Sequence, residues 1–255
     1  MKALKKIRNS YLYGNRFVND PFHIEAQEKT KAERSKEPKR TDIINYLLSL
    51  FNRQTTYLEI GVRNPDFNYT HIKADNKYSV DPGVEFKENP VDFKVTSDEF
   101  FASLDMGKIL SKNIKFDVIF VDGLHLAEQV DRDILNSLRY IKEDGFIVLH
   151  DCNPPTEWHA REEFYYTLSP SHGFWNGTTW KAFAKYRSDA SLYSCCIDTD
   201  WGVGILSKKH QLGNSTSLKN PFYEYKVMAE KREEFLNLID FGQLKKKLSA
   251  AEFNS

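Results

Sequence analysis

Apolar residues fall into two kinds of segment from residue 41 onward. Short runs rich in β-branched and aromatic residues predict strands, at 56–60, 77–80, 91–95, 116–121, 146–149, 191–197 and 201–206. Other segments repeat apolar residues every three or four positions, which predicts helices. These helices are expected at 41–51, at 69–73, after Ser97-Asp98, from Leu126 to Ile141 and at 178–186, with Thr41-Asp42 and Ser97-Asp98 as N-caps. Strands that alternate with helices predict an α/β protein.

The two most apolar runs indicate the centre of the sheet. Phe116–Val121 is almost continuously apolar, and Phe146–Leu149 follows it after one helix. Such runs are typical of parallel strands that helices cover on both faces. The runs 191–197 and 201–206 are joined by polar residues, which predicts a hairpin. We therefore expect a Rossmann-like, doubly wound, mostly parallel seven-stranded sheet with a C-terminal antiparallel β-hairpin and helices on both faces.

Both ends of the chain depart from this pattern. In the N-terminal segment we expect four aromatic residues to pack on the core, namely Tyr11, Tyr13, Phe17 and Phe22. Residues 25–40 contain almost no apolar side chains, which favours a solvated helix or linker. The expected domains are an arm and linker at 1–40, an α/β domain at 41–206 with an insert at 152–188, and a helical extension at 207–255. The amphipathic segment 222–248 would pack on its own core or form a homodimer contact, and both interpretations stay open.

Composition narrows the class of protein. The 36 Lys and Arg residues equal the 36 Asp and Glu residues in number. This balance argues against a dedicated nucleic-acid binder, which usually has a basic excess. The three cysteines show neither a disulfide framework nor zinc-ligand spacing, which favours a cytoplasmic location. We also expect no signal peptide and no membrane partner, because no apolar run is long enough to span a bilayer.

The first strand and the acid that follows the second strand suggest a nucleotide-binding site. The run Thr56–Ile60 breaks at Gly61, and the run that ends in Asp81 follows about twenty residues later. A strand, a glycine turn, a helix-sized connection and a strand that ends in an acid form half of a nucleotide-binding unit. Ligands of such sheets bind at the carboxyl ends of the strands.

The motifs along residues 41–206 resemble one family when they are taken in order. They are Glu59-x-Gly61, Asp81, Ser97-Asp98, Phe116–Asp122 and Phe146–Asp151, and the hairpin closes the series. This order is similar to that of class I S-adenosylmethionine-dependent methyltransferases. The DGLH stretch at 122–125 and the HD pair at 150–151 resemble a branch met among small-molecule and sugar O-methyltransferases.

The resemblance implies roles for these residues. The turn Glu59–Gly61 would approach the methionine part of the cofactor, and Asp81 would accept hydrogen bonds from the ribose hydroxyls. Ser97 and Asp98 would border the adenine. Asp122 would lie beneath the sulfonium and the incoming acceptor. One stretch departs from the family pattern, because the loop Val62–Asp66 lacks the further glycines that let a backbone approach the ligand closely.

Methyl transfer to a hydroxyl requires that the hydroxyl lose a proton. His125 is a candidate base, because histidine titrates near neutral pH; the alternative is a histidine that caps its helix. Asp122, Asp151 and Asn153 are candidate ligands for Mg²⁺ or Ca²⁺, since these ions prefer oxygen ligands. His150 would contact the acceptor or orient Asp151.

The insert 152–188 is expected to cover the acceptor. The insert mixes flat apolar faces with hydrogen-bonding groups, a combination that suits a sugar or another polyhydroxylated acceptor; these residues are Trp158, His159, Trp175, Asn176, Trp180 and Lys181. The candidate substrate-binding residues are His150, Asn153, Trp158 and Trp180. The alternative is that the tryptophans fasten the insert to the sheet.

The sequence thus predicts an S-adenosylmethionine-dependent methyltransferase that acts on a hydroxyl of a small polar acceptor, such as a sugar or glycan precursor. A methyltransferase-like domain that binds a nucleotide or partner without catalysis is the alternative, and the loop Val62–Asp66 supports it. A nicotinamide-dependent oxidoreductase ranks last, because G-x-G-x-x-G does not follow the first strand.

Overall fold

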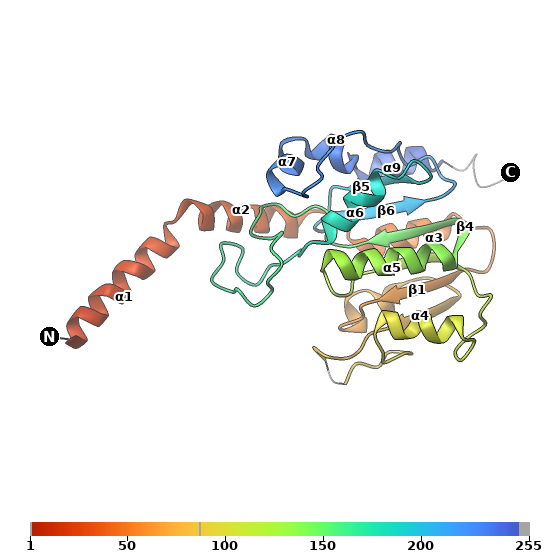
Figure 1. The fold of residues 1–255 in the computed structure, drawn as a ribbon, viewed down its shortest axis with the longest axis horizontal. Coiled ribbons are helices and arrows are strands. Elements are labelled where there is room, and N and C mark those ends of the chain that lie inside the picture. The colour runs from red at the N-terminus through yellow and green to blue at the C-terminus, as the bar shows by residue number, and fades with distance from the viewer. Residues whose placement is uncertain (1, 87, 250–255) are drawn as a thin grey trace.

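The structure, a computed structural model, describes residues 2–86 and 88–249. A seven-stranded sheet crosses the centre of the molecule (Figure 1). Its strands are β1 (Thr56–Ile60), β2 (Asn76–Val80), β3 (Phe116–Val121), β4 (Ile141–Leu149), β5 (Tyr193–Ile197), β6 (Val203–Ser207) and β7 (Leu238–Ile239). Their order in the sheet is β2-β1-β3-β4-β6-β5-β7. Only β6 runs antiparallel to its neighbours, so the predicted mostly parallel sheet with a terminal hairpin is confirmed.

Helices lie on both faces of this sheet. The helices of the described residues are α1 (Lys2–Val18), α2 (Pro21–Ser35), α3 (Arg40–Ser49), α4 (Ser97–Asp105), α5 (Ala127–Tyr140), α6 (Thr179–Arg187), α7 (Tyr225–Glu230), α8 (Arg232–Leu236) and α9 (Phe241–Lys247), with the short 3₁₀ helices η1 (Pro65–Phe67) and η2 (Tyr69–His71), and α1 and α2 lie outside the two layers (Figure 1). Apolar residues of α4, α5, α6 and α8 form one core, and those of α3 and α9 form another. A strand that is buried by helices on both faces has little room for polar side chains, which explains why five of the six residues of β3 are apolar. The exception, Asp117, is paired with Arg53 and Lys142.

The seventh strand is not where the pattern predicts it. Residues 91–95 form no strand; Phe93 makes a single bridge to Val80, and the Asp92 carboxylate accepts hydrogen bonds from the amide and the hydroxyl of Ser79. The sheet instead gains β7 from the C-terminal segment. Asn237 adopts a left-handed conformation with φ +46°, ends α8 and lets Leu238 and Ile239 pair with β5. This contact has no signal in the local pattern, because two apolar residues fit a helix equally well.

Two predicted helix caps are wrong by one or two residues. Thr96, rather than Ser97-Asp98, caps α4, and it forms a capping box with Glu99. Helix α3 begins at Arg40, with no side-chain cap at Lys39. The hydroxyl of Thr41 instead donates a hydrogen bond to Asn68, 2.6 Å away.

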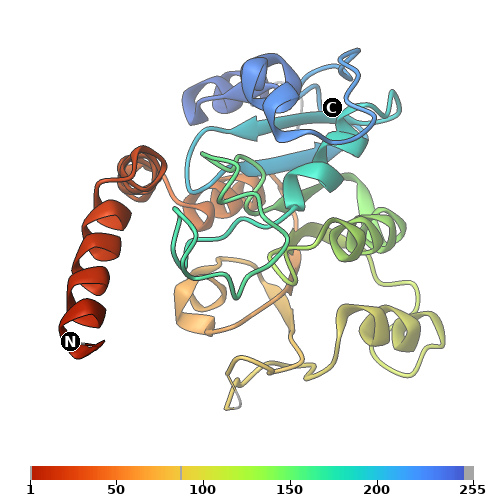
Figure 2. The ribbon, with the colours of Figure 1, turned by 60° about the vertical axis from the view of Figure 1, so that its left-hand side comes forward.

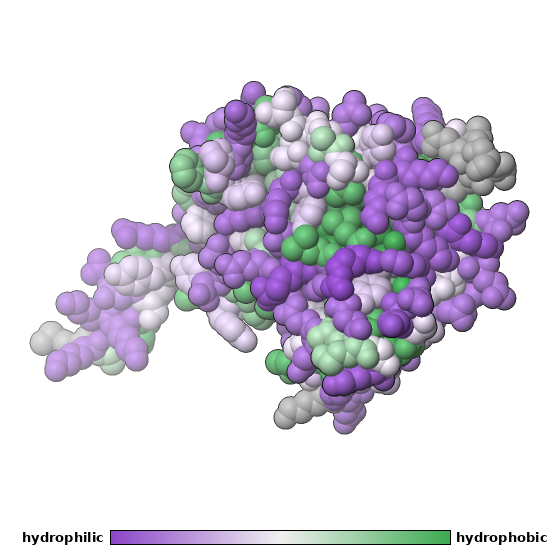
Figure 3. Space-filling model, turned by 45° about the vertical axis from the view of Figure 1, so that its right-hand side comes forward, coloured by the Kyte–Doolittle hydropathy of each residue, from purple (hydrophilic) through white to green (hydrophobic). Residues whose placement is uncertain are grey.

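The N-terminal helices differ from the expected arm. Helix α1 stands apart from the body and buries none of its residues (Figures 1 and 2). The expected packing of Tyr11 and Tyr13 on the core is wrong, since their exposed fractions are 73% and 67%. Figure 3 shows this helix as a mostly hydrophilic extension of the molecule. None of the helices within residues 2–86 and 88–249 has the length and apolar content needed to cross a bilayer.

Helix α2 packs against the insert instead of remaining solvated. Its buried side is narrow and mostly polar, and it contains His23, Ala26, Thr30 and Glu33. Thr30 Oγ1 lies 2.9 Å from His159 Nε2, and Thr156 Oγ1 lies 2.8 Å from His159 Nδ1. Burial lowers the pKa of His159 to about 3, so this imidazole is neutral and joins two hydroxyls. Apolar periodicity does not predict this buried side of α2, because hydrogen bonds take the place of apolar contacts there.

Candidate active site

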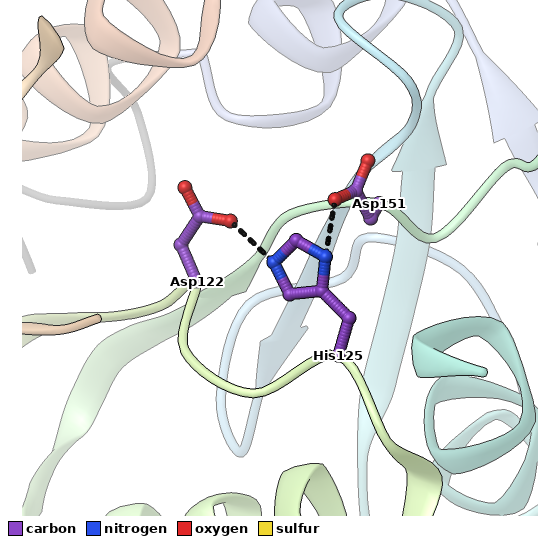
Figure 4. A group of neighbouring side chains, drawn as sticks. All are labelled: Asp122, His125 and Asp151. Carbon is purple, nitrogen blue, oxygen red and sulfur yellow. Dashed lines mark ion pairs between the residues drawn. The ribbon is translucent and has the colours of Figure 1, made fainter. Parts of the chain in front are cut away.

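The carboxyl ends of three neighbouring strands meet at one edge of the sheet. Gly61 follows β1, Asp122 follows β3, and His150 and Asp151 follow β4. His125 lies in the loop between Asp122 and α5, and it returns to the same edge (Figure 4). The predicted catalytic residues are therefore neighbours in space, as expected for a parallel sheet.

The His125 ring lies between two carboxylates, as Figure 4 shows. Its Nε2 is 3.3 Å from Asp122 Oδ1, and its Nδ1 is 3.0 Å from Asp151 Oδ2. His150 Nδ1 approaches the same two side chains, at 3.1 Å from Asp122 Oδ1 and 3.4 Å from Asp151 Oδ2. Two imidazoles thus share two carboxylates at the strand ends.

Two residues that the sequence analysis did not select complete this group. Arg40, at the start of α3, places Nε 3.7 Å from Asp122 Oδ2. Asp200, in the turn between β5 and β6, lies 3.1 Å from Arg40 Nη1 and 3.6 Å from His150 Nε2. The six residues Arg40, Asp122, His125, His150, Asp151 and Asp200 are called the charged cluster below. Arg40 and Asp200 are far from the motifs in sequence, and no local pattern distinguishes them from surface charges.

Electrostatics within the charged cluster favour ionised side chains. Burial alone would lower the pKa of His125, but the carboxylates of Asp151 and Asp122 outweigh it and raise that pKa. The pKa of His150 is raised well above its usual value for the same reason, against the effect of burial. Burial would raise the pKa of Asp122, yet His150, His125 and Arg40 together lower it. The charged cluster therefore favours the protonated forms of the two imidazoles and the ionised form of Asp122.

Left-handed backbone positions shape this edge of the sheet. Asp151 has φ +61°, Asp200 has φ +46° and Trp201 has φ +67°. Each costs about 1–2 kcal/mol for a residue other than glycine. The amides of Cys152 and Asn153 donate to the carbonyls of Gly202 and Trp201, each at 2.9 Å, and these bonds hold the two segments together. Strain at residues that bear the acidic side chains is typical of functional sites.

Trp175 is the insert residue that contacts this site. Its ring stacks on His125 with centroids 5.3 Å apart, and its Nε1 donates to the carbonyl of Arg161 at 2.6 Å. Asn176, the next residue, donates through Nδ2 to Asp151 Oδ1 at 2.8 Å. The insert thus fixes both His125 and Asp151.

The other tryptophans that we predicted as acceptor-binding residues lie elsewhere. Trp180 is 1% exposed and packs against Tyr225 and Phe235, so it is a core residue and we do not retain it. Trp158 is half-buried beside Phe22 of α2, with ring centroids 6.1 Å apart. For these two residues the alternative interpretation, which has them fasten the insert, describes the contacts better.

Asn153 also departs from its predicted position. Its side-chain amide donates to Asp198 at 3.1 Å and its oxygen accepts from Arg232, so it is directed away from Asp122 and Asp151. The group that could hold a metal ion is Asp122, His125 and Asp151, whose ligand atoms lie within 4.8 Å of one another. Two carboxylates and one imidazole suit Mg²⁺ or Mn²⁺, because hard oxygen ligands dominate the set.

The turn after β1 closes tightly on the turn after β3. Gly61 has φ +91°, and a Cβ at this position would lie 2.2 Å from the carbonyl oxygen of Asp122. Glu59 is 3% exposed, and it accepts hydrogen bonds from Tyr57 at 2.6 Å and from Asn68 at 2.9 Å. Burial raises the pKa of Glu59 to about 7. Glu59 is thus held inside the protein instead of lying open at the surface.

The loop that lacks glycines has an ordered structure of its own. Residues 65–71 form η1 and η2, and the buried Asn68 between them contacts Glu59, Tyr57 and Thr41. The carbonyl of Val62 accepts a hydrogen bond from Asn89, and Arg63 pairs with Glu85 at 3.0 Å. Val62 and Arg63, just after Gly61, therefore contact Asn89 and Glu85. Asn68 was missed because a single asparagine in a polar loop carries no local signal.

The remaining predicted cofactor residues line the neighbouring edge. Asp81 is half-buried and accepts from the Gly83 amide at 2.6 Å; burial raises its pKa. Ser97 Oγ accepts from Gln129 at 3.1 Å, and the exposed Asp98 pairs with Arg132 at 3.2 Å. A carboxylate at the end of β2 fits the ribose hydroxyls of an adenosyl group, because hydroxyls need an acceptor there.

Comparison with known proteins agrees with this arrangement. Residues 66–152 match the family described as "Methyltransferase domain". No match was found among curated proteins. Among solved structures, the chain resembles the O-methyltransferase TomG from Streptomyces achromogenes at 14% identity and a TM-score of 0.44, over 74% of this chain and 90% of that one. An O-methyltransferase from Bacillus cereus resembles it at 12% identity and a TM-score of 0.40, over 74% and 92% of the two chains.

These structural similarities are distant, and the assignment does not depend on them. The matched segment begins in the loop after Gly61 and ends just beyond Asp151, so it contains the strand ends that carry Asp81, Asp122 and Asp151. The sheet is mostly parallel and contains the antiparallel hairpin that was predicted to close the motif series. The resemblance in the sequence therefore agrees with the match of residues 66–152 to the methyltransferase-domain family and with the mostly parallel seven-stranded sheet.

Proposed function

We propose that this protein transfers the methyl group of S-adenosylmethionine to a hydroxyl of a small polar acceptor, such as a sugar or a glycan precursor. The observation that supports this proposal is the position of His125, between Asp122 and Asp151 at the carboxyl edge of the sheet. A hydroxyl acceptor needs a base at this edge, and the cofactor supplies an already activated methyl group.

The reaction would proceed by one displacement. His125 would accept the proton of the acceptor hydroxyl, and the cofactor would supply an activated methyl group to the acceptor oxygen and leave as S-adenosylhomocysteine. Asp151 would orient the imidazole and Asp122 would lie beside the reacting centre. Only the neutral form of His125 can accept a proton. Its raised pKa moves the appearance of this form to higher pH, so turnover should rise as the pH passes that pKa.

The cofactor would lie along the ends of β1 and β2. Asp81 would hold the ribose, Ser97 and Asp98 would border the adenine, and the turn at Gly61 would approach the methionine part. Glu59 would act from beneath this turn, since its carboxyl group is bound by Asn68 and Tyr57.

A divalent cation is the second component that we propose for this site. Asp122, His125 and Asp151 would hold it, and it would lower the pKa of an acceptor hydroxyl as a Lewis acid; in that form of the site a neutral His125 would serve as a metal ligand and not as the base. Asn153 is not included, because its side chain binds Asp198 and Arg232. A homodimer, a cytoplasmic location and the lack of nucleic-acid and membrane partners stay predictions from the sequence.

Calorimetry with S-adenosylhomocysteine tests the proposal against a non-catalytic domain. We expect the pure protein to bind it, and Asp81→Ala to weaken binding roughly tenfold or more, because a charged hydrogen-bond partner is lost. Asp189→Ala, an exposed aspartate in the loop before β5, is the matched control and should bind as the natural protein does. Absence of binding by folded protein would contradict the proposed function.

A further inference from the structure

A cavity of about 390 Å³ lies between α2 and the insert, apart from the charged cluster. Its lining consists of Gln27, Thr30, Lys31, Arg34, Ser35, Pro170, Ser171, His172 and Phe174. The volume falls in the range of roughly 300–1,000 Å³ that is usual for small-molecule sites.

The lining carries cationic side chains and no carboxylate. Lys31 and Arg34 extend from α2, and within residues 2–86 and 88–249 neither forms an ion pair with an acidic side chain. The Arg34 guanidinium lies 5.6 Å from the centre of the Phe174 ring, so it stays at the cavity. Most of the other lysines and arginines near this edge are already engaged, as Arg40 and Arg161 show. Two unpaired cations in an acid-free cavity favour an anionic ligand.

Lys31 and Arg34 are the groups of this lining that are left to bind a phosphate. The nearby polar side chains already have partners in the protein, since Thr30 contacts His159, Ser35 donates to the Ala32 carbonyl and Ser171 accepts from Arg161. Arginine binds phosphate oxygens through a planar fork of donors, and lysine adds a point charge. The cavity is larger than one phosphate group and leaves room for a small organic part such as a hexose.

One wall residue of this cavity contacts a sequence neighbour of the charged cluster. Phe174 stacks on Trp201 with ring centroids 5.7 Å apart at 22°, and Trp201 directly follows Asp200. Arg161 fixes the insert beside it, because its guanidinium donates to the carbonyls of Trp158, Phe164, His172 and Phe174 and to Ser171 Oγ. The cavity is therefore a built part of the insert, and its Phe174 wall contacts Trp201, the residue next to Asp200.

We propose that the cavity between α2 and the insert binds a phosphate group that the methyl acceptor carries, so that the acceptor is a phosphorylated sugar or a similar phosphate ester. Lys31 and Arg34 bind the phosphate, and Phe174 and Trp201 guide the organic part toward Asp200 and the charged cluster. This inference rests on the proposed function, since it names the substrate class of the same protein.

Calorimetry of the full-length protein with three probes tests it: α-D-glucose 1-phosphate, glucose and inorganic phosphate. We expect the sugar phosphate to bind more tightly than inorganic phosphate, and glucose not to bind over the same concentration range. Arg34→Gln should weaken binding of the sugar phosphate roughly tenfold or more, because a charge-assisted bidentate contact is lost.

The matched control is Arg16→Gln, which removes the same charge from the exposed helix α1. It should bind the sugar phosphate as the natural protein does. The inference would be overturned if both variants lost the same affinity for the sugar phosphate. It would also be overturned if the natural protein bound S-adenosylhomocysteine but not the sugar phosphate. Equal affinity for inorganic phosphate and the sugar phosphate would also overturn it, because the cavity would then hold an ion and no acceptor. Binding of S-adenosylhomocysteine is measured separately, so failure of the cavity and failure of the proposed function are distinguishable.

Discussion

Nδ1 of His125 lies 3.0 Å from Oδ2 of Asp151, although the two residues come from loops after different strands. The backbone carbonyl of His125 also accepts a hydrogen bond from Thr178 at 2.7 Å, and Trp175 covers its ring. The imidazole is therefore positioned from three sides. A base whose orientation is set by its neighbours needs little reorganisation when the acceptor arrives.

Asp151→Asn should lower the pKa of His125. The substitution removes a charge that stabilises the imidazolium, and a neighbouring carboxylate typically shifts a pKa by about 1–3 units. Titration of the histidine ring signals by NMR, on protein treated with a chelator, measures this pKa. Asp189→Asn changes the same residue type at a distant loop and should leave the signals unchanged. An unshifted His125 in Asp151→Asn would contradict the electrostatic coupling.

His125→Gln should reduce turnover much more than cofactor binding. Loss of a general base lowers the rate about 10²–10⁴-fold, while the predicted cofactor residues are untouched. The measurement is transfer of labelled methyl from S-adenosylmethionine to a panel of sugars and sugar phosphates. His71→Gln, which alters an exposed histidine of η2, serves as the control. A fully active His125→Gln protein would remove this residue as the base.

Mn²⁺ should bind at Asp122, His125 and Asp151 and not at Asn153. Titration followed by electron paramagnetic resonance measures the affinity, and Asp151→Asn should weaken it roughly tenfold or more, because a charged ligand is lost. Asn153→Ala should bind Mn²⁺ as the natural protein does, since its amide contacts Asp198 and Arg232. Removal of metal by a chelator should lower methyl transfer, and unchanged activity would show that the cation is dispensable.

Gly61→Ala should destabilise the fold far more than Gly107→Ala. Both glycines have positive φ, at +91° and +66°. An alanine in the left-handed region lowers the free energy of unfolding by about 1–2 kcal/mol. At Gly107 this is the whole cost, because an added Cβ would have no atom within 4 Å. At Gly61 the new Cβ would lie 2.2 Å from the Asp122 carbonyl oxygen, so the two turns must separate. Urea unfolding measures the difference, and equal losses would refute the close contact.

Glu59 should make stability fall as the pH rises from about 4.5 to above 7. Its pKa is about 7 in the folded protein against 4.5 for the free side chain, so the folded state holds the proton more tightly. The contribution of Glu59 to the free energy of unfolding is fully present below its pKa in the unfolded chain. It is lost as the pH rises through its pKa in the folded protein. A shift of this size corresponds to about 3 kcal/mol. Urea unfolding of Glu59→Gln between pH 5 and pH 8.5 should give a flatter profile, whereas the exposed Glu143→Gln should reproduce the natural profile.

Local patterns were sufficient where each element has its own periodic signal. β1, β3 and the hairpin of β5 and β6 follow the predicted runs, and α5 and α6 lie within about two residues of the predicted helices. Asp122 and Asp151 could be brought together from the sequence alone, because parallel strands must end at one edge. Elements without such a signal were misplaced, as the two-residue strand β7 and the irregular residues 91–95 show.

The sequence by itself determined the α/β class, the parallel strands and the acids at their ends, since hydrophobic period and strand direction are local consequences of residue order. Only the tertiary structure decided which side chains complete the site. Arg40 and Asp200 join the charged cluster, Trp175 covers His125, and Asn153 turns away. These outcomes depend on how distant loops pack and on where buried polar atoms find partners. That selection is made by the whole fold, because burial penalises an unpaired polar group wherever it lies in the chain.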